Sequence, residues 1–311
     1  MVMLRRASSL IVCTAMLAAS SPAAAQDDDW LQLAPATSWV LDYAEDSCAL
    51  RRAFGDEGQQ VLLELRQYSP GDSMQVIVTS DDIRRNDSGF RFRSSRGVTA
   101  NFIPDTEPHN IGRPLGIDNG DWGEGFVASL GIFPARERAL AARLASEQNV
   151  TLQISDERRA ERENEITGFA VGDGFREDFV LLTGSMRPPM NAMRECLDEL
   201  LLHWGIDAEA HRSLLRPARP LRMEVWSREL QERYPTDMLR AGEQAIVNVR
   251  LTVNEEGRAS DCSVQNSLNE PTFDELACEL LLEHSRFEPA LDGNGDPITS
   301  YWVTRVIYTM G

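Results

Sequence analysis

The chain has 311 residues, of which 49 are acidic and 31 are arginine or lysine, so its formal net charge is −18. Nucleic acids and anionic lipid surfaces both require clustered cations, and so acidic a chain is therefore not expected to bind either of them. Hydrophobic residues make up 42% of the chain, which is enough for globular packing, and the length favours two domains.

The first 25 residues have the pattern of a secretory signal peptide. Arg5 and Arg6 precede the short apolar stretch Leu10–Ala19, and the small residues Ala23–Ala25 are typical of a cleavage site. The apolar stretch is far shorter than the roughly 20 residues that cross a bilayer. We therefore expect cleavage before Gln26 and an extracytoplasmic mature protein. The alternative is that the segment is retained as an inner-membrane anchor, and only then would the chain contact the membrane.

Residues 27–216 are expected to form a mostly β, α+β domain of unassigned role. Runs of β-branched and apolar residues bounded by turn residues predict short strands; these are Trp39–Tyr43, Cys48–Phe54, Val61–Gln67, Met74–Thr79, Val150–Ile154, Phe169–Val171 and Asp178–Leu182. Helices are predicted at Pro134–Glu147, which is rich in good helix formers, and at Pro189–Trp204, which has one apolar face. The second helix is expected to dock on the sheet.

Four cysteines follow the predicted signal peptide: Cys48, Cys196, Cys262 and Cys278. An even number of cysteines in an exported protein favours disulfides, and four cysteines allow three pairings. We favour Cys48–Cys196 and Cys262–Cys278, which give one bond to each domain. Zinc binding is the competing interpretation, but no C-x-x-C occurs and the histidines are scattered, so we expect no metal and no cofactor.

The proline- and arginine-containing residues 217–222 are predicted to be a short linker before a small C-terminal domain at 223–311. A strand is predicted at Gln244–Val253, because every odd position from Val247 to Val253 is apolar and the even positions between them are polar. Gly257 permits a reversal into a second strand at Arg258–Val264. A helix follows around Phe273–Glu283. Ser300–Tyr308 is dense in β-branched and aromatic residues and predicts the last strand. The expected outcome is a three-stranded antiparallel sheet with helices.

This order of elements, over about residues 230–311, resembles the C-terminal domain of TonB, the periplasmic protein that couples inner-membrane energy to outer-membrane receptors. The positions that carry the resemblance are Tyr234-Pro235, Gly242, Val247, Val249, Val253, Gly257, Val264, Ser267, Phe273-Asp274, Ala277, Phe287, Pro289-Ala290, Gly295 and Pro297. The resemblance implies a periplasmic protein of the Gram-negative envelope. Energy-transducing TonB proteins also carry a membrane anchor and a long proline-rich spacer, whereas the predicted linker here is very short.

The resemblance further implies a partner-binding strand. A small open sheet exposes an edge that can accept a strand from another protein, and TonB-family domains bind receptors near their last strand. Carried over to this chain, Tyr301, Val303, Arg305 and Ile307 lie near the contact. The alternative interpretation is that these four residues only pack the sheet. The expected partner is an outer-membrane receptor or another envelope protein, and a homodimer through edge strands is a further use of the same edge.

No catalytic pattern was found, and the chain is expected not to be an enzyme. The alternative for residues 27–216 is a periplasmic hydrolase whose groups lie on loops, among Asp105, His109, Asp118 and Asp121. Polar loop residues are more often simply solvated. The chain is therefore expected to be a periplasmic binding or adaptor protein, with an anchored energy transducer for TonB-dependent transport as the first alternative and the hydrolase as the second.

Overall fold

The computed structural model describes residues 30–81, 97–105, 109–112, 114–148, 154–243, 245–266 and 271–308. The predicted signal peptide lies outside these residues, as does nearly all of the strand predicted at Val150–Ile154. Residues 31–311 form one compact unit. Within the described part of the chain, two large hydrophobic clusters are separate: one is built from residues 33–200 and the other from residues 218–308.

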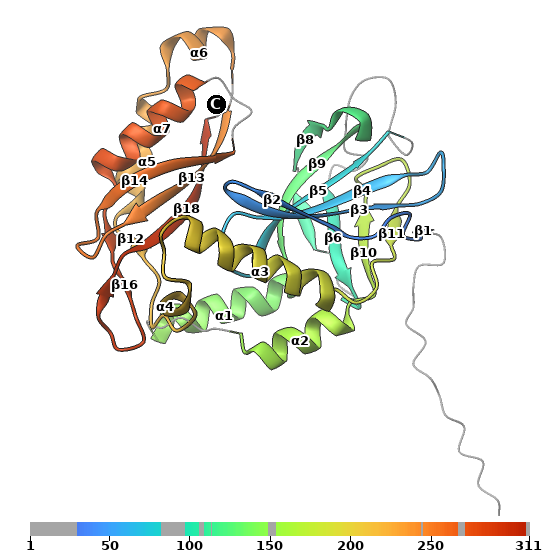
Figure 1. Cartoon of the computed structure of the whole chain (residues 1–311). Coiled ribbons are helices and arrows are strands. Elements are labelled where there is room, and N and C mark those ends of the chain that lie inside the picture. Colours follow the sequence, from blue (N-terminus) through green and yellow to red (C-terminus); the bar gives the residue numbers. More distant parts are fainter. Residues whose placement is uncertain are drawn as a thin grey trace, which may run out of the picture. The chain divides into compact units, whose positions relative to one another are not determined.

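The N-terminal cluster lies between two sheets (Figure 1). The first is wholly antiparallel, in the order β2-β3-β4-β5-β9-β8. Its strands are β2 (Val40–Ala44), β3 (Ser47–Phe54), β4 (Val61–Gln67), β5 (Ser73–Ser80), β9 (Glu124–Gly131) and β8 (Leu115–Asp118). The second has the order β1-β11-β10-β6-β7, in which only β1 and β11 are parallel. Its strands are β1 (Leu31–Leu33), β11 (Phe179–Leu181), β10 (Gly168–Gly172), β6 (Val98–Ile103) and β7 (Asn110–Gly112).

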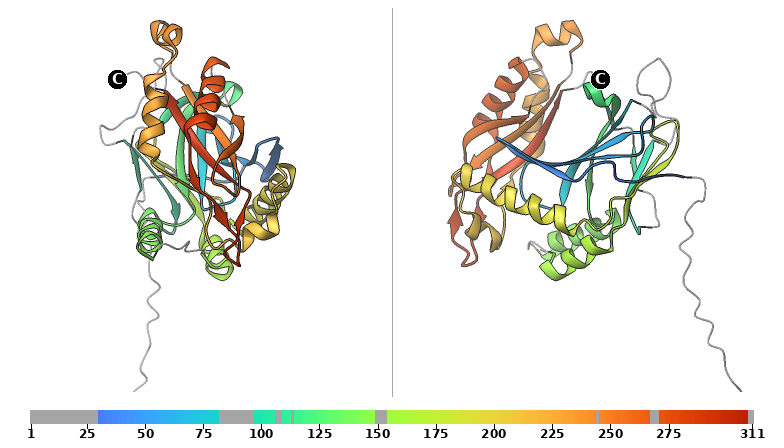
Figure 2. Two further views of the ribbon diagram at one scale, coloured as in Figure 1. Left: turned by 90° about the vertical axis from the view of Figure 1, so that its left-hand side faces the viewer. Right: turned by 45° about the vertical axis from the view of Figure 1, so that its right-hand side comes forward.

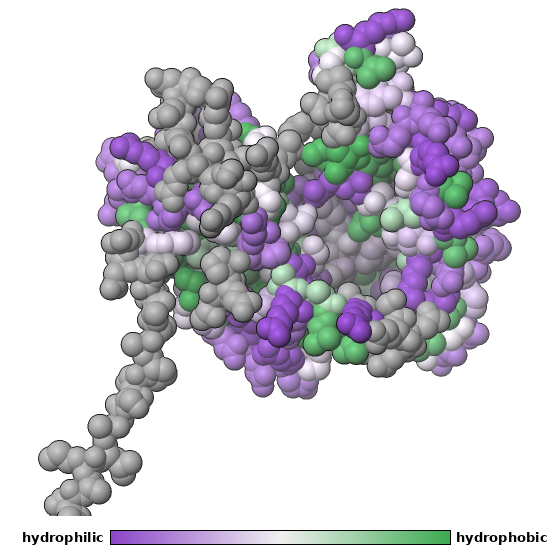
Figure 3. Space-filling view, turned by 180° about the vertical axis from the view of Figure 1, so that it is seen from behind, coloured by the Kyte–Doolittle hydropathy of each residue, from purple (hydrophilic) through white to green (hydrophobic). Residues whose placement is uncertain are grey.

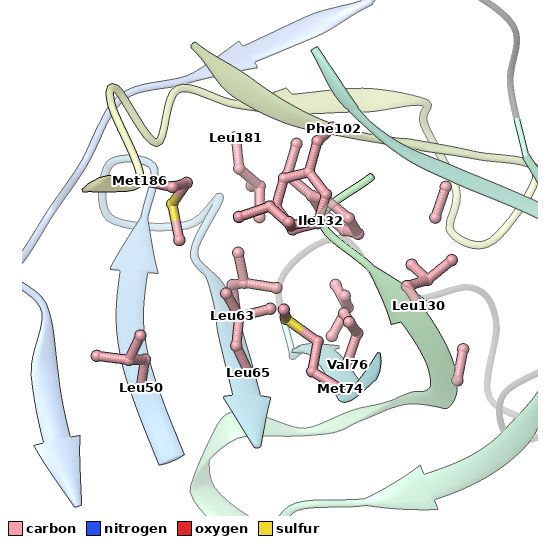
Figure 4. Close-up of a cluster of buried hydrophobic side chains, with 14 of the residues drawn as sticks. Leu50, Leu63, Leu65, Met74, Val76, Phe102, Leu130, Ile132, Leu181 and Met186 are labelled. Atoms are coloured by element: carbon pink, nitrogen blue, oxygen red, sulfur yellow. The ribbon is translucent and has the colours of Figure 1, made fainter. Parts of the chain in front are cut away.

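Both sheets contribute side chains to this core. Leu63 and Val76 come from the first sheet, and Phe102 and Leu181 come from the second, so that the two sets face each other (Figure 4). Each of these four side chains is at most 2% exposed. Alternation of apolar and polar residues along β5 and β6 explains how one face of each strand is buried.

Helix α3 (Arg187–His203) closes one side of the N-terminal core. Its buried face includes Met190, Met193, Leu197 and Leu200, which recur at helical spacing. The other helices of this region are η1 (Gly120–Trp122), α1 (Ala135–Gln148), α2 (Asp156–Glu165) and α4 (Ala208–Arg212). The helices predicted at Pro134–Glu147 and Pro189–Trp204 correspond to α1 and α3, whereas α2 was not predicted.

The C-terminal domain is built on the antiparallel sheet β14-β13-β18. Its long elements are α5 (Met223–Glu232), α6 (Thr236–Ala241), β13 (Ala245–Val253), β14 (Ala259–Asn266), α7 (Pro271–His284) and β18 (Ser300–Tyr308). Figure 2 shows α5 and α7 on the same face of the sheet. The odd positions of β13 are fully buried beneath them, as the alternation predicted. The predicted α+β class and the small sheet with helices are confirmed.

The predicted linker, residues 217–222, lies against the C-terminal domain. β12 (Arg219–Pro220) pairs with β15 (Phe287–Glu288), and Ala218 belongs to the C-terminal core. A hairpin of β16 (Ala290–Leu291) and β17 (Pro297–Ile298) follows. The proposed domain boundaries stay a prediction, but the two hydrophobic clusters divide the described residues near the same place.

Candidate partner-binding strand of the C-terminal domain

β18 is an edge strand. It pairs with β13 over its whole length, from Ala245↔Tyr308 to Val253↔Ser300, and no other described strand pairs with it. The Nε2 group of Gln231, a residue of α5, donates a hydrogen bond to the carbonyl oxygen of Ile307 at 3.2 Å. We infer that this oxygen is directed away from β13.

Backbone groups of an antiparallel strand alternate in direction, so those of Tyr301, Val303 and Arg305 are directed away from β13 as well. Among the described residues, only Gln231 supplies a hydrogen bond to this edge. Apart from the carbonyl of Ile307, the edge is therefore open in the sense that its outward backbone groups have no hydrogen-bond partner among the described residues.

The side chains of the four residues predicted to bind a partner share the sheet face opposite the core, because Trp302, Val306 and Tyr308 pack into the core. Their surroundings differ. Tyr301 packs against other aromatic rings, Val303 and Arg305 line a cavity, and Ile307 is 45% exposed.

The N-terminal end of β18 packs in an aromatic cluster, which comprises Trp204, His211 and Tyr301. The Tyr301 ring stacks on His211 with centroids 5.7 Å apart and meets the edge of Trp204 at 5.6 Å. Burial raises the pKa of the Tyr301 hydroxyl to about 12. Tyr301 is thus already packed, in contrast with Ile307 at the other end of the strand.

His211 in this cluster is a neutral imidazole of defined tautomer. Its Nδ1 lies 2.8 Å from the carbonyl oxygen of Asp207, which can only accept, so Nδ1 carries the proton. Its Nε2 then accepts from the Ser300 hydroxyl at 2.7 Å. Burial lowers the pKa of His211, and the nearby Asp207 opposes that shift. Helix α4, whose N-cap is Asp207, positions the ring.

The same face of the sheet makes further contacts with residues 46–68. The Nε2 group of Gln265 donates to the carbonyl oxygens of Asp46 at 3.1 Å and Tyr68 at 2.9 Å. Arg250 is 7% exposed and donates to the Ser263 hydroxyl at 2.7 Å. Burial lowers the pKa of Arg250, and the carboxylate of Asp46 opposes this effect.

A cavity of about 450 Å³ adjoins the middle of β18. Residues 66–75 line it on one side, and Asn248, Gln265 and residues 303–305 line it on the other. Arg305 crosses it, with weak 3.4 Å hydrogen bonds to Asn248 and to the Ser129 hydroxyl. The open backbone of Val303 therefore lies beside a space that can accept a side chain of a bound segment.

Both predicted disulfides are present. Cys48 of β3 is bonded to Cys196 of α3, with Cα atoms 6.2 Å apart, and Cys262 of β14 is bonded to Cys278 of α7, with Cα atoms 5.6 Å apart. The predicted pairing of one bond per domain is confirmed. Each bond fastens a helix to the sheet on which it packs.

The structure brings together only two of the four candidate hydrolase residues. Asp105 and His109 line one cavity, whereas Asp118 and Asp121 lie at the turn from β8 into η1 and do not line it. The carboxylate of Asp105 accepts a hydrogen bond from Arg162 at 2.7 Å. Among the described residues, no group of three or more histidine, cysteine or acidic side chains is placed to hold a metal ion.

Comparison with known families decides the nature of the C-terminal domain. Residues 231–310 match the family described as the Gram-negative bacterial TonB protein C-terminal. This domain is TonB-like. The match confirms the resemblance predicted for about residues 230–311 and indicates a protein of the Gram-negative envelope. It covers about a quarter of the chain, and no curated protein matches the sequence.

The TonB C-terminal family is not an enzyme family, but its match does not extend to residues 27–216. In the described part of the chain, every helix is too short or too polar to cross a bilayer. The residues that hold the start of β18, Trp204 and His211, were not predicted, because nothing in the sequence pairs them with a strand so far along the chain.

Proposed function

We propose that the protein is a periplasmic adaptor whose TonB-like domain binds an outer-membrane receptor or another envelope protein by strand addition to β18. The observation that carries the proposal is the open edge of β18, described above. An added strand would hydrogen-bond to the outward backbone groups of residues 301–305. Gln231 already occupies the carbonyl of Ile307, so it marks one end of the available edge.

The side chains beside the open edge of β18 also support strand addition. Val303 and Arg305 line the cavity next to β18, and Ile307 exposes an apolar side chain. Alternate side chains of an added strand point to opposite faces, so one set would enter the cavity while the other faces the helices. Hydrophilic residues cover most of the described surface on the face shown in Figure 3, and its hydrophobic patches are separate from one another.

Proline at Val303 tests this proposal directly. Proline lacks the backbone N–H, and the N–H of Val303 is directed to the open edge, so Val303→Pro removes one donor for a partner while the bonds to β13 remain. The matched control Val303→Ala keeps the N–H and shortens the side chain. Binding is measured by calorimetry with peptides copied from the periplasmic segments of outer-membrane receptors of the same host.

The expected result is that the alanine variant binds a receptor peptide nearly as well as the parent protein and the proline variant loses binding. Equal binding by folded Val303→Pro would rule out strand addition at this position. Pairing of two copies through β18 is the competing use of the edge. Light scattering distinguishes it, because a dimer that dissociates on Val303→Pro substitution assigns the edge to self-association.

The cellular location of the protein is tested by determining the N-terminal residue of its mature form. A mature protein beginning at Gln26 in the periplasmic fraction supports the adaptor. A membrane-bound form that retains Met1 would instead support an anchored energy transducer, and mass spectrometry of the native protein distinguishes the two.

A further inference from the structure

A second cavity, of about 490 Å³, lies in the N-terminal domain where β6 and β9 meet the start of α1. Pockets of this size hold small organic ligands. Its apolar walls include Phe102 and Phe133, and its charged side chains are Asp105, Arg136 and Arg138. His109 also lines it, and burial together with Arg138 lowers the pKa of that imidazole, which leaves His109 as a neutral hydrogen-bonding group near pH 7.

Arg138 is held against the backbone at one side of this cavity. A Cβ atom built on Gly131 would lie 2.7 Å from Cδ and 2.8 Å from Nε of Arg138, so only glycine at 131 leaves room for this side chain. The Nε group is buried and has no hydrogen-bond partner among the described residues. An unpaired buried donor destabilises the folded protein, and a charged one more than a neutral one.

The two arginines are not neutralised by the acidic residue in the cavity. Asp105 is committed to Arg162, whose Nη2 lies 2.7 Å from Oδ2, while the Nε group of Arg162 donates to the carbonyl oxygen of Ile132 at 2.8 Å. Neither Arg136 nor Arg138 forms an ion pair with any described carboxylate, although the chain has 49 acidic residues. Two arginines without acidic partners in so acidic a protein indicate a place for an anion from outside.

We propose that this cavity binds a small organic carboxylate that carries an apolar group. The planar guanidinium of Arg138 matches a carboxylate, with Arg136 adding a second positive charge, and the apolar group lies on Phe102 and Phe133. The nearby carboxylate of Asp105 favours a singly charged ligand over a doubly charged phosphate. This site is distinct from β18, and it assigns a binding role to the domain that the TonB-family match does not cover.

Calorimetric titration of the full chain with benzoate, benzamide and inorganic phosphate tests the proposal. Benzoate supplies a carboxylate on an apolar ring, benzamide is its neutral analogue, and phosphate is an anion without an apolar part. A ligand of this size reaches a Kd of about 1 mM at ordinary ligand efficiency. We expect benzoate to bind in this range. Benzamide should bind at least about tenfold more weakly because it lacks the charge-assisted contact. Phosphate should also bind at least about tenfold more weakly, because it lacks the apolar group.

Arg138→Gln is expected to weaken benzoate binding by about tenfold or more. Arg228→Gln, at an exposed position of α5, removes the same charge far from the cavity lining and should leave binding unchanged. If Arg138→Gln does not fold, Arg136→Gln takes its place, because Arg136 lines the same cavity at an exposed position. It should also weaken benzoate binding. Benzamide or phosphate binding as tight as benzoate, no benzoate binding, or equal loss in Arg228→Gln would each overturn the proposal.

Discussion

The guanidinium of Arg250, on β13, lies over the indole ring of Trp204, 4.5 Å from the ring centroid. Trp204 follows the last residue of α3, so the contact joins the TonB-like sheet to the helix that closes the N-terminal core. Arg250 is almost completely buried, and a desolvated cation over an indole ring is the favourable case for this interaction.

A double-mutant cycle of Arg250→Met and Trp204→Leu measures this contact. We expect each single substitution to lower the free energy of unfolding and the two to be coupled by about 1–2 kcal/mol, because either one removes the cation–π contact. Trp204→Leu also removes the ring contact with Tyr301, but that loss is the same in both arms of the cycle. Urea denaturation provides the four free energies. Additive effects would show that the two residues are only neighbours.

Acidification is expected to destabilise the start of β18 through His211. Its pKa is lowered in the folded protein, so folding favours the neutral imidazole. The resulting contribution to stability is fully present above the pKa of His211 in the unfolded chain, about 6.5. It is lost as the pH falls through the lower pKa of His211 in the folded protein. The free energy of unfolding should therefore drop from about pH 7.5 to about pH 5.5, and His211→Gln should make that drop smaller. The exposed His203→Gln serves as control and should leave it unchanged.

Alanine substitutions at the loop glycines Gly257 and Gly295 distinguish the cost of backbone strain from the cost of steric overlap. Both have positive φ, +73° and +90° respectively, but a Cβ on Gly257 would lie 2.0 Å from the carbonyl oxygen of Phe287, whereas a Cβ on Gly295 would meet nothing within 4 Å. Gly295→Ala should cost about 1–2 kcal/mol for its backbone conformation alone. Gly257→Ala should cost about 1–3 kcal/mol more, because the backbone of Phe287 must move. Thermal unfolding compares them, and equal losses would contradict the predicted overlap.

Removal of the Cys262–Cys278 bond should destabilise the TonB-like domain. The cysteines are 16 residues apart, and closing a loop of this size is worth about 3 kcal/mol through the restricted unfolded chain. The double variant Cys262→Ser/Cys278→Ser is compared with the parent protein by urea denaturation without reductant. The control is the Cys48→Ser/Cys196→Ser protein measured with and without reductant, because only the Cys262–Cys278 bond can then be broken and no further side chain is replaced. A double variant within about 1 kcal/mol of the parent would show that the bond adds little.

The sequence predicted those elements whose burial is apolar and periodic. β18 was predicted with its observed bounds, and β13 to within one residue, because each has a strong strand pattern. Helix α2 was missed for a physical reason. Its buried residues are Arg162 and Glu163, which are stabilised by ion pairs with Asp105 and with Arg187 and Arg194, so it has no apolar stripe to detect.

The candidate site was predicted only in part. The resemblance to the TonB C-terminal domain predicted a partner-binding edge near the last strand, and β18 lies at an edge of its sheet. The packing of Tyr301 against Trp204 and His211, and the cavity beside Val303, depend on contacts between segments far apart in the sequence. No local pattern records such contacts, which explains why the four residues were expected to be equivalent although only Ile307 is freely exposed.

The Cys48–Cys196 bond joins two residues that are 148 positions apart in the sequence, and the chain between them forms one covalent ring. A protease that cuts a single peptide bond anywhere between these two cysteines opens that ring without releasing a fragment. The nicked chain would keep the mass of the intact chain, plus one water, on a non-reducing gel and would separate into two pieces only after reduction. In a compartment that contains proteases, this bond allows the N-terminal domain to keep its parts together after a first cut.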